Sequence, residues 1–439
     1  MGHKRANARY DDTRAPVNLH GMWIKRLSSS RLLELPWRNP SFGLYSAGSA
    51  VSLIGMWMQR ISVGWLTWQL TGSGFWLGVV AFADFFPVVL IGPIAGTAAD
   101  RWDRLTIVKI CQAISLLQAT TLCWLTATGH MTIEVLVALT SVQGTVVAFY
   151  QPARLALVPS LVPQADLATA VALNSVVFNL ARFIGPACAG AVIVWSEVWA
   201  AFAANAVSYV PFLAALFYIR VNPDHVPAKA RSMLTELREG IGYTVSHPAI
   251  AALLVLLTAT GVGGRPLSEL LPGIAADLFH AGAGGLSLLA SSMGGGAILG
   301  GLWVGERGHA ADLTRMAATS SILAALATIA SITTDTLWVA MPAVAVIGFA
   351  TSVAGIAIQS SIQLATGGPL RGRVMGLYGL IFRGAPAIGA LGAGAASAVF
   401  GLRIPIIFGA LLMAAVSARI YFSRERIAAT LERDVKAEP

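Results

Sequence analysis

Residues 75–104 read FWLGVVAFADFFPVVLIGPIAGTAADRWDR, and this stretch holds the features that decide the fold. Residues 75–99 are almost wholly apolar, and a short charged turn follows them. At a rise of 1.5 Å per residue, about 20 apolar residues are enough for a helix to cross the hydrocarbon core of a bilayer. The pattern therefore predicts a membrane-spanning helix that ends in a turn at the membrane surface.

The composition of the whole chain agrees with this interpretation. Of its 439 residues, 56% are hydrophobic and 12% are charged, and the mean hydropathy is +0.70. A soluble domain carries about 25% charged residues, so a soluble enzyme, collagen, a disordered chain and a small disulfide scaffold are excluded. The apolar runs are long and do not alternate in polarity, which favours helices over a transmembrane barrel. We predict an all-α integral membrane protein.

Twelve apolar runs follow one another along the chain, and we interpret each as a transmembrane helix. They cover residues 42–70, 75–99, 105–128, 132–151, 167–195, 199–219, 249–277, 284–305, 314–332, 336–362, 373–398 and 402–421. The predicted domain plan is an N-terminal cytoplasmic tail at 1–40, six-helix bundles at 41–219 and 248–421, a cytoplasmic linker at 220–247, and a cytoplasmic tail at 422–439. The linker is expected to contain an amphipathic helix near 233–243.

Basic residues predict how the spans are oriented. With the N-terminus placed inside, 25 of the 30 Lys and Arg residues fall on the inner side and only Arg403 falls in an outer loop. Basic residues collect in cytoplasmic loops, so both termini are predicted to be cytoplasmic. The first 40 residues show no signal peptide. The formal charge of +9 is explained by orientation and predicts no nucleic-acid partner.

The two halves of the chain resemble each other. Three groups of residues recur in order at nearly one offset: Asn39-Pro40 with His247-Pro248; Gly92-x-x-x-Gly96 with Gly301-x-x-x-Gly305; and Leu173, Phe178, Gly185, Gly190 with Leu377, Phe382, Gly389, Gly394. This indicates two pseudo-symmetric six-helix bundles. Parallel repeats of this kind place a binding site between the halves, near the membrane midplane.

The charged turn after the second span is a candidate cytoplasmic gate. Its glycines permit close helix packing, and Asp100 lies where it can meet the positive end of the eleventh helix. The alternative is an ordinary positive-inside turn. The predicted gate residues are Gly96, Asp100, Arg101, Arg104 and Arg373.

The pattern Gly96-x-x-x-Asp100-Arg101-x-x-Arg104 resembles the loop signature of the major facilitator superfamily. Further motifs resemble a branch that includes the enterobactin exporter and macrolide efflux proteins: Asn39-Pro-Ser-Phe42, Gln59-Arg60, Leu70-Thr-Gly-Ser73, Gln151-Pro-Ala-Arg154, Leu161-Val-Pro163, Ala172-Leu-Asn174, Phe178-Asn-Leu-Ala-Arg182, Gly185-Pro186 and Arg371-Gly-Arg-Val-Met-Gly-Leu-Tyr378. The resemblance implies the major facilitator fold and a proton-coupled exporter that works by alternating access.

Two motifs depart from the patterns of related exporters. Many drug/proton antiporters carry Arg-x-x-Gln-Gly on the fourth helix, whereas Thr140 precedes Gln143-Gly144 here. The arginine that usually couples protons is therefore missing from this position. On the fifth helix, Gly185-Pro186-Ala-Cys-Ala-Gly190 only approximates the signature Gly-Pro-x-x-Gly-Gly.

Ionisable residues inside the spans are the candidates for proton coupling, because they are costly in a bilayer and face a partner or a wet cavity. Arg60 lies ten residues before Leu70 and Asp84 nine residues after Phe75, so a rise of 1.5 Å per residue places both at one depth. We predict an Arg60–Asp84 pair, which is either a proton switch or a permanent lock. Glu269 is the third candidate; it lies four residues after Arg265 on one helix face.

The remaining intramembrane side chains predict the cargo. Arg182, Arg265 and Arg383 outnumber the acidic residues, so the cavity should have a positive potential that suits an anionic or polyphenolic cargo. Further cavity candidates are Gln143, Asn174, Asn179, Asn205, Gln359, Gln363 and Trp57. For each of the amides the alternative is a hydrogen bond between helices. Trp65 and Trp68 are expected in an interfacial belt.

These patterns together predict a monomeric secondary transporter in the cytoplasmic (inner) membrane of a bacterium. Its partners would be a small-molecule substrate, protons and the lipid bilayer. The expected cargo is siderophore-like, anionic or aromatic; the alternative is multidrug or macrolide efflux. A membrane-embedded enzyme or lipid-handling protein is the rival class, but the spans hold no nucleophile or metal set. No phosphate-binding loop, cofactor motif or paired-cysteine motif is present in the sequence.

Overall fold

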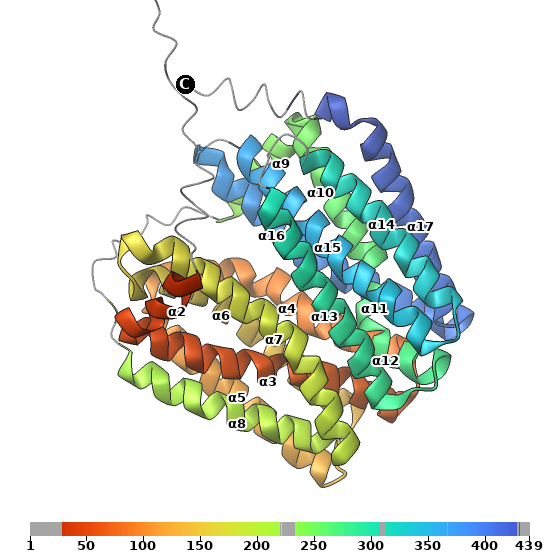
Figure 1. The fold of residues 1–439 in the computed structure, drawn as a ribbon, viewed down its shortest axis with the longest axis horizontal. Helices are drawn as coiled ribbons and strands as arrows, with labels where there is room; N and C mark the ends of the chain where they lie inside the picture. The colour runs from red at the N-terminus through yellow and green to blue at the C-terminus, as the bar shows by residue number, and fades with distance from the viewer. Residues whose placement is uncertain are drawn as a thin grey trace, which may run out of the picture.

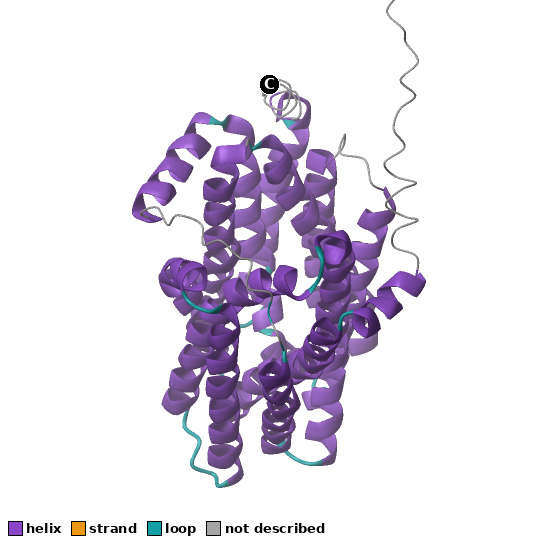
Figure 2. Cartoon of the chain, turned by 90° about the vertical axis from the view of Figure 1, so that its left-hand side faces the viewer, coloured by secondary structure: helices purple, strands orange, loops and turns teal. Residues whose placement is uncertain are grey.

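The computed structural model describes residues 29–219, 221, 233–307, 313–366, 368–427 and 430. Within these residues the secondary structure is entirely helical, and short loops join the helices (Figure 2). The helices divide into an N-terminal and a C-terminal group, coloured red to yellow and green to blue in Figure 1.

The N-terminal half contains one short helix and six long helices. They are α2 (Ser29–Arg38), α3 (Pro40–Thr71), α4 (Gly74–Arg101), α5 (Arg104–Ala127), α6 (Ile133–Leu157), α7 (Leu167–Trp195) and α8 (Val198–Tyr218), with short 3-10 turns between α6 and α7 at Val158–Leu161 and Gln164–Asp166. The short helix α2 packs against α3 and α7.

The C-terminal half begins with α9 (Met233–Ser246), which is the helix expected in the linker. The seventh span then comprises α10 (Pro248–Ala259), η3 (Thr260–Gly264), α11 (Pro266–Glu269), α12 (Leu271–Gly273) and η4 (Ile274–Leu278). The remaining helices are α13 (Gly282–Arg307), α14 (Leu313–Thr333), α15 (Leu337–Ala365), α16 (Gly368–Phe400) and α17 (Arg403–Phe422).

The twelve predicted spans are confirmed. Eleven described segments are long and apolar enough to cross a membrane. The twelfth is α3, which has 32 residues and packs against α7 and α8 of its own bundle. Its lower hydropathy reflects its polar residues, such as Gln59 and Arg60. Proline at the first turn starts both α3 and α10, after Asn39 and His247, because proline needs no hydrogen-bond acceptor there.

The seventh span is not the continuous helix that its apolar run predicts. Two π-helical turns, η3 and η4, interrupt it. Pro266 and Pro272 lack the backbone N–H of a regular helix, and three glycines lie in the first π-turn. Within η3 the amide of Arg265 donates to the Thr260 carbonyl oxygen at 3.2 Å, five residues back. The short helix α11 is held between these two irregular turns.

The two halves touch at one end of the molecule, which we call the loop end because it holds the turns at 72–73, 196–197, 279–281 and 401–402. There, α4 packs against α16 and α7 packs against α13. A Cβ built on Gly78 would lie 2.6 Å from the Ala390 carbonyl oxygen, and one on Gly190 would lie 2.2 Å from the Ser287 Oγ. Only glycine permits this approach of the helices.

A shared apolar core seals the loop end. Leu77 of α4 joins Leu267, Leu271 and Ile274 of the seventh span in one buried cluster. Trp65 and Trp68 pack against this cluster. The expectation that these two tryptophans form an interfacial belt is therefore wrong: they close the space between the halves because the broken seventh span turns its apolar residues towards them.

At the opposite end, which we call the tail end, the halves are apart (Figure 1). A Cβ built on Gly96, Gly301 or Gly376 would meet no described heavy atom within 4 Å outside its own helix. The close helix contact that the Gly92-x-x-x-Gly96 pattern suggested is therefore not made in this conformation. The molecule is closed at the loop end and open at the tail end.

Two neighbouring glycines of α13 test the packing inside the C-terminal bundle. A Cβ at Gly300 would lie 2.5 Å from the Phe349 carbonyl oxygen of α15, whereas a Cβ at Gly301 would meet no atom of the described residues within 4 Å outside its own helix. We expect Gly300→Ala to lower stability by about 1–3 kcal/mol through overpacking. Gly301→Ala should be neutral or stabilising by up to about 1 kcal/mol, because alanine favours helix. Thermal unfolding of the purified protein in detergent compares them; equal unfolding temperatures would contradict this packing.

Candidate transport site

A cavity of about 270 Å³ lies between the halves, and helices of both bundles line it. The predicted residues that it brings together are Trp57, Arg60, Asp84, Gln143, Arg182, Arg265, Glu269 and Arg383. Phe85, Phe178 and Phe382 add aromatic rings to the wall. A charged and aromatic chamber at mid-span is the arrangement expected of a binding site between two repeats.

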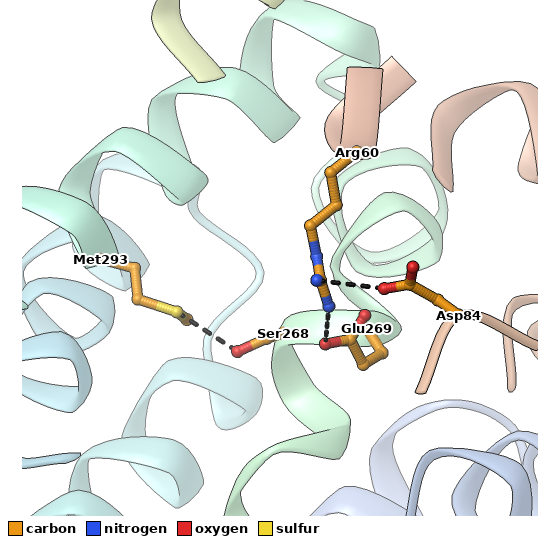
Figure 3. Close-up of polar contacts among 5 residues, drawn as sticks. All are labelled: Arg60, Asp84, Ser268, Glu269 and Met293. Carbon is orange, nitrogen blue, oxygen red and sulfur yellow. Dashed lines mark hydrogen bonds and ion pairs between the residues drawn. The ribbon is translucent and has the colours of Figure 1, made fainter. Parts of the chain in front are cut away.

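Arg60 forms the centre of the charged wall (Figure 3). Its Nη1 donates to Asp84 Oδ2 at 3.2 Å, and its Nη2 donates to Glu269 Oε1 at 2.9 Å. The Arg60–Asp84 pair predicted from equal depth is confirmed. Arg60 and Asp84 come from α3 and α4 of the N-terminal half, whereas Glu269 ends α11 of the C-terminal half. One guanidinium group therefore joins the two bundles.

Aromatic rings support the same guanidinium group. The Cζ of Arg60 lies 4.9 Å from the ring centre of Phe85 and 5.7 Å from that of Trp57. Trp57 also lies under Arg182, whose Cζ is 5.6 Å from its ring centre. Such cation–π contacts partly replace the lost hydration of a buried cation. Cargo that stacks on Trp57 would therefore have to displace an arginine in this conformation.

Arg265 and Glu269 point to different partners. The Cζ of Arg265 lies 5.3 Å from the ring centre of Phe382, whereas Glu269 binds Arg60. Their i, i+4 spacing predicts a shared helix face, and α11 does follow Arg265 as α-helix, but the two side chains extend to different groups. Within the described part of the chain, no hydrogen bond or ion pair is formed by the side chains of Arg182, Arg265 or Arg383.

A second cavity of about 360 Å³ adjoins the first and lies mainly in the C-terminal half. Arg182, Arg265, Phe382 and Pro386 line both spaces. Gln359, one of the predicted residues, lines the second cavity.

Four predicted cavity residues are not among those that line either space. Asn174 instead accepts a hydrogen bond from Arg154 Nη2 at 3.1 Å, and the Asn179 amide donates to the Ser175 carbonyl oxygen of its own helix at 2.9 Å. Gln363 is exposed one turn beyond Gln359 on α15. Asn205 is fully buried and donates to Gln59 Oε1 at 2.7 Å, so it bonds between helices.

Arg154 is a cavity residue that the sequence did not indicate. Because the fourth apolar run ends at 151, the sequence pattern predicts that Arg154 lies in an inner loop. In the structure α6 extends to Leu157, and Arg154 is only 3% exposed. Its Cζ lies 5.6 Å from the ring centre of Phe178. The Gln151-Pro-Ala-Arg154 motif could have indicated this position, because Pro152 lies inside α6, where proline removes a backbone hydrogen bond.

The predicted gate residues surround the open tail end. Arg104 clamps the turn: its Nη1 donates to the Ala156 carbonyl oxygen at 3.3 Å and its Nε to the Ala99 carbonyl oxygen at 3.4 Å. Arg101 is exposed. The carbonyl oxygen of Arg373 lies against Gly240 of α9. The side chain of Asp100 lies outside the described atoms, so its contact with the start of α16 stays a prediction.

Asp103 caps α5 within this turn. Its Oδ2 accepts from the Thr106 backbone amide at 2.9 Å and from the Thr106 hydroxyl. Partial burial raises the pKa of the Asp103 carboxyl, but these hydrogen bonds outweigh it and hold the pKa below its usual value. The carboxylate therefore stays ionised at neutral pH and fixes the start of α5 beside the gate.

A family model described as transmembrane secretion effector matches residues 34–438, which is nearly the whole chain. The chain belongs to this family of the major facilitator superfamily. Solved structures agree on the fold of this superfamily member. A bacterial homologue of the lysosomal transporter Spinster, in an inward-facing and unoccupied conformation, matches with a TM-score of 0.68 at 15% identity over 91% of this chain and 98% of that one. A POT family transporter in complex with a thioalcohol-conjugated peptide matches with a TM-score of 0.70 at 12% identity over 88% and 96%.

Curated relatives of this superfamily member are transporters. The staphyloferrin A transporter of Staphylococcus aureus is 27% identical over 54% of this chain and 59% of that protein. Macrolide efflux protein A of Streptococcus pyogenes is 24% identical over 60% and 65%, and the multidrug efflux pump Tap of Mycolicibacterium fortuitum is 26% identical over 78% and 85%. The matches thus cover less than two thirds of the first two relatives' length. The chain is therefore a multi-pass membrane protein of a transporter family.

The Arg60 contacts of this facilitator can be tested by stability. Arg60→Met would leave two carboxylates facing each other without a cation. We expect a loss of about 1–3 kcal/mol, less than the full penalty for an unpaired buried charge because a third of the Arg60 side chain is exposed. Adding Asp84→Asn and Glu269→Gln should recover much of this loss.

Thermal unfolding of the purified protein measures these differences. Arg403→Met serves as a matched control, because Arg403 pairs with Asp335 at the exposed loop end and such surface pairs contribute only about 0–1 kcal/mol. A triple variant that unfolds no later than Arg60→Met would show that the carboxylates are not the source of the instability.

Proposed function

We propose that the chain exports a small anionic or aromatic compound by alternating access, in exchange for protons. The observation that carries this proposal is the contact of Arg60 with Asp84 in its own half and with Glu269 in the other. A cation held between two carboxylates is sensitive to protons, because a proton on either carboxylate removes the charge that binds it. Thr140 lacks the charge that related antiporters have at this position, and Arg60 supplies one from α3.

The coupling step follows from the position of these groups. Protonation of Glu269 weakens the bond that joins α3 to α11, and so lowers the free energy needed to separate the halves at this level. Loss of the proton restores the bond.

The cargo is inferred from the cavity wall. Five arginines and two carboxylates line the central cavity: Arg60, Arg154, Arg182, Arg265, Arg383, Asp84 and Glu269. The excess of positive charge favours an anionic group in the cargo. The buried Gln143 Oε1 and Trp57 Nε1 have no hydrogen-bond partner within the described structure, so each can bind cargo. Phenylalanine rings also line this cavity, so aromatic drugs and macrolides are the second candidate class of cargo.

The proposed setting is the inner membrane of a bacterium, with both termini, the linker at 220–247 and the tails at 1–40 and 422–439 in the cytoplasm. The tail end would then face the cytoplasm, and the present conformation would be inward-facing. Bundles at 41–219 and 248–421 would rock about the central cavity, with the residues near Gly96, Arg101, Arg104 and Arg373 closing its inner side. A monomer is sufficient for this cycle.

Transport in inside-out vesicles tests the coupling. With an acidic lumen, vesicles that contain the protein should accumulate a catecholate siderophore or a macrolide from the medium, because protons leave as cargo enters. Asp84→Asn and Glu269→Gln should each reduce accumulation to the level without a gradient, since neither amide can carry the proton. Exchange of labelled for unlabelled cargo should persist.

Asp277→Asn is the matched control, because Asp277 is an exposed carboxylate at the end of the same broken span. Gradient-driven accumulation that survives in both Asp84→Asn and Glu269→Gln would reject proton coupling through these groups. Accumulation by the unaltered protein that ignores collapse of the gradient would reject proton coupling altogether.

Orientation is tested by labelling single introduced cysteines with a membrane-impermeant maleimide. His130→Cys, in the exposed turn between α5 and α6, should react in intact cells, whereas Trp102→Cys, at a position that is 64% exposed at the tail end, should react only after permeabilisation. The unaltered chain gives the background, since Cys111 is buried and Cys123 and Cys188 are half-buried. The reverse pattern would place both termini outside.

A further inference from the structure

The residues that line the second cavity differ in charge from those that line the central cavity. Its volume is about 360 Å³, enough for a ligand of moderate size, and the described residues that line it include two arginines and no carboxylate. The central cavity differs, because it contains both acidic groups of the proton-sensitive contact. The described lining of the C-terminal space therefore carries positive charge that no carboxylate within the same lining offsets.

The two arginines stand where the cavities meet, one from each half of the molecule. Arg182 belongs to α7, and Arg265 lies between η3 and α11. Each rests on an aromatic ring, at 5.6 Å for Trp57 and 5.3 Å for Phe382. Neither makes a hydrogen bond or ion pair within the described residues, so their N–H groups are available. Two guanidinium groups of this kind bind a carboxylate or a similar oxyanion.

Three hydroxyl groups that line the second cavity are restricted in what they can bind. Each already donates its proton to a carbonyl oxygen of its own span: Thr260 to Leu257 at 2.9 Å, Ser321 to Ala317 at 2.8 Å and Thr351 to Ile347 at 2.7 Å. A hydroxyl whose proton is engaged offers only its lone pairs. These side chains therefore accept hydrogen bonds, and they suit a ligand that carries O–H or N–H donors.

We propose that the C-terminal cavity binds the hydroxylated part of a carboxylate-bearing cargo, with the carboxylate held between Arg182 and Arg265. This inference rests on the proposed function and deepens it by naming the substrate class: a hydroxylated carboxylic acid whose aromatic or apolar part can extend into the central cavity. Because the two arginines belong to different halves, one carboxylate bound to both draws the bundles together. Cargo binding thereby favours closure around the ligand.

Two aryl glycosides provide a matched pair of probes. 4-Nitrophenyl β-glucuronide has an aromatic ring, sugar hydroxyls and a carboxylate, whereas 4-nitrophenyl β-glucoside carries a neutral hydroxymethyl group in place of the carboxylate. Binding to the purified full chain in detergent is measured by titration calorimetry without any proton gradient. We expect the glucuronide to bind at least about tenfold more tightly than the glucoside, as loss of charged hydrogen bonds implies.

Variants assign this preference to the residues. Arg182→Gln and Arg265→Gln should each weaken glucuronide binding about tenfold or more, and should leave the weak glucoside binding unchanged. Thr351→Val should weaken binding of both probes about two- to tenfold, because it removes an acceptor for a sugar hydroxyl. The controls are Arg419→Gln and Thr319→Val, at exposed positions outside the cavity.

Equal affinity for the two probes, no measurable glucuronide binding, or glucuronide binding that is unaffected in both arginine variants would each overturn this inference. These outcomes are independent of the transport test. A chain that exports cargo in exchange for protons but fails here retains the proposed function and loses only the substrate class. Normal thermal unfolding of each variant shows that lost binding is not lost folding.

Discussion

The structure depends on the cost of keeping charge inside a membrane. A guanidinium group at mid-span needs partners, and Arg60 obtains them from both bundles: a carboxylate on either side and aromatic rings beside it. These contacts hold Arg60 of α3 and Asp84 of α4 at one depth. They also bring Glu269, at the end of α11, into contact with the N-terminal half. The apolar core and glycine contacts at the loop end then close the remaining space. The halves are thus joined by polar contacts at the centre and by apolar contacts at one end.

The arginines of the cavity form two groups with different surroundings. Arg60 is compensated by acidic residues of the protein itself, whereas Arg182 and Arg265 have aromatic rings for neighbours and no acidic partner at hydrogen-bonding distance within the described chain. In the proposed cycle, this division separates the group that responds to protons from the groups that bind an anion. All three arginines line the central cavity, so binding of cargo and binding of protons would act on the same pair of bundles.

Sequence patterns predicted much of this arrangement, for identifiable reasons. The spans follow from apolar length, and the Arg60–Asp84 pair follows from equal depth on consecutive antiparallel helices, which needs no knowledge of packing. The contact of Glu269 with Arg60 could not be derived in this way, because it depends on how the two halves lean together. Arg154 was missed because a charge near a helix end resembles a loop residue. Asn174 was misassigned because its partner, Arg154, was itself misplaced.

The irregular seventh span has a consequence for geometry. A π-turn contains one residue more than an α-turn, so every side chain after it is rotated by about 100° about the helix axis compared with an uninterrupted helix. The turn at Thr260–Gly264 thus determines the direction in which Glu269 faces, and the turn at Ile274–Leu278 adds a second such rotation beyond it. Rewinding the first turn into regular helix would swing this carboxylate away from Arg60 while α10 stayed in place, so the strength of the link between the bundles is set by the winding of a single stretch of backbone.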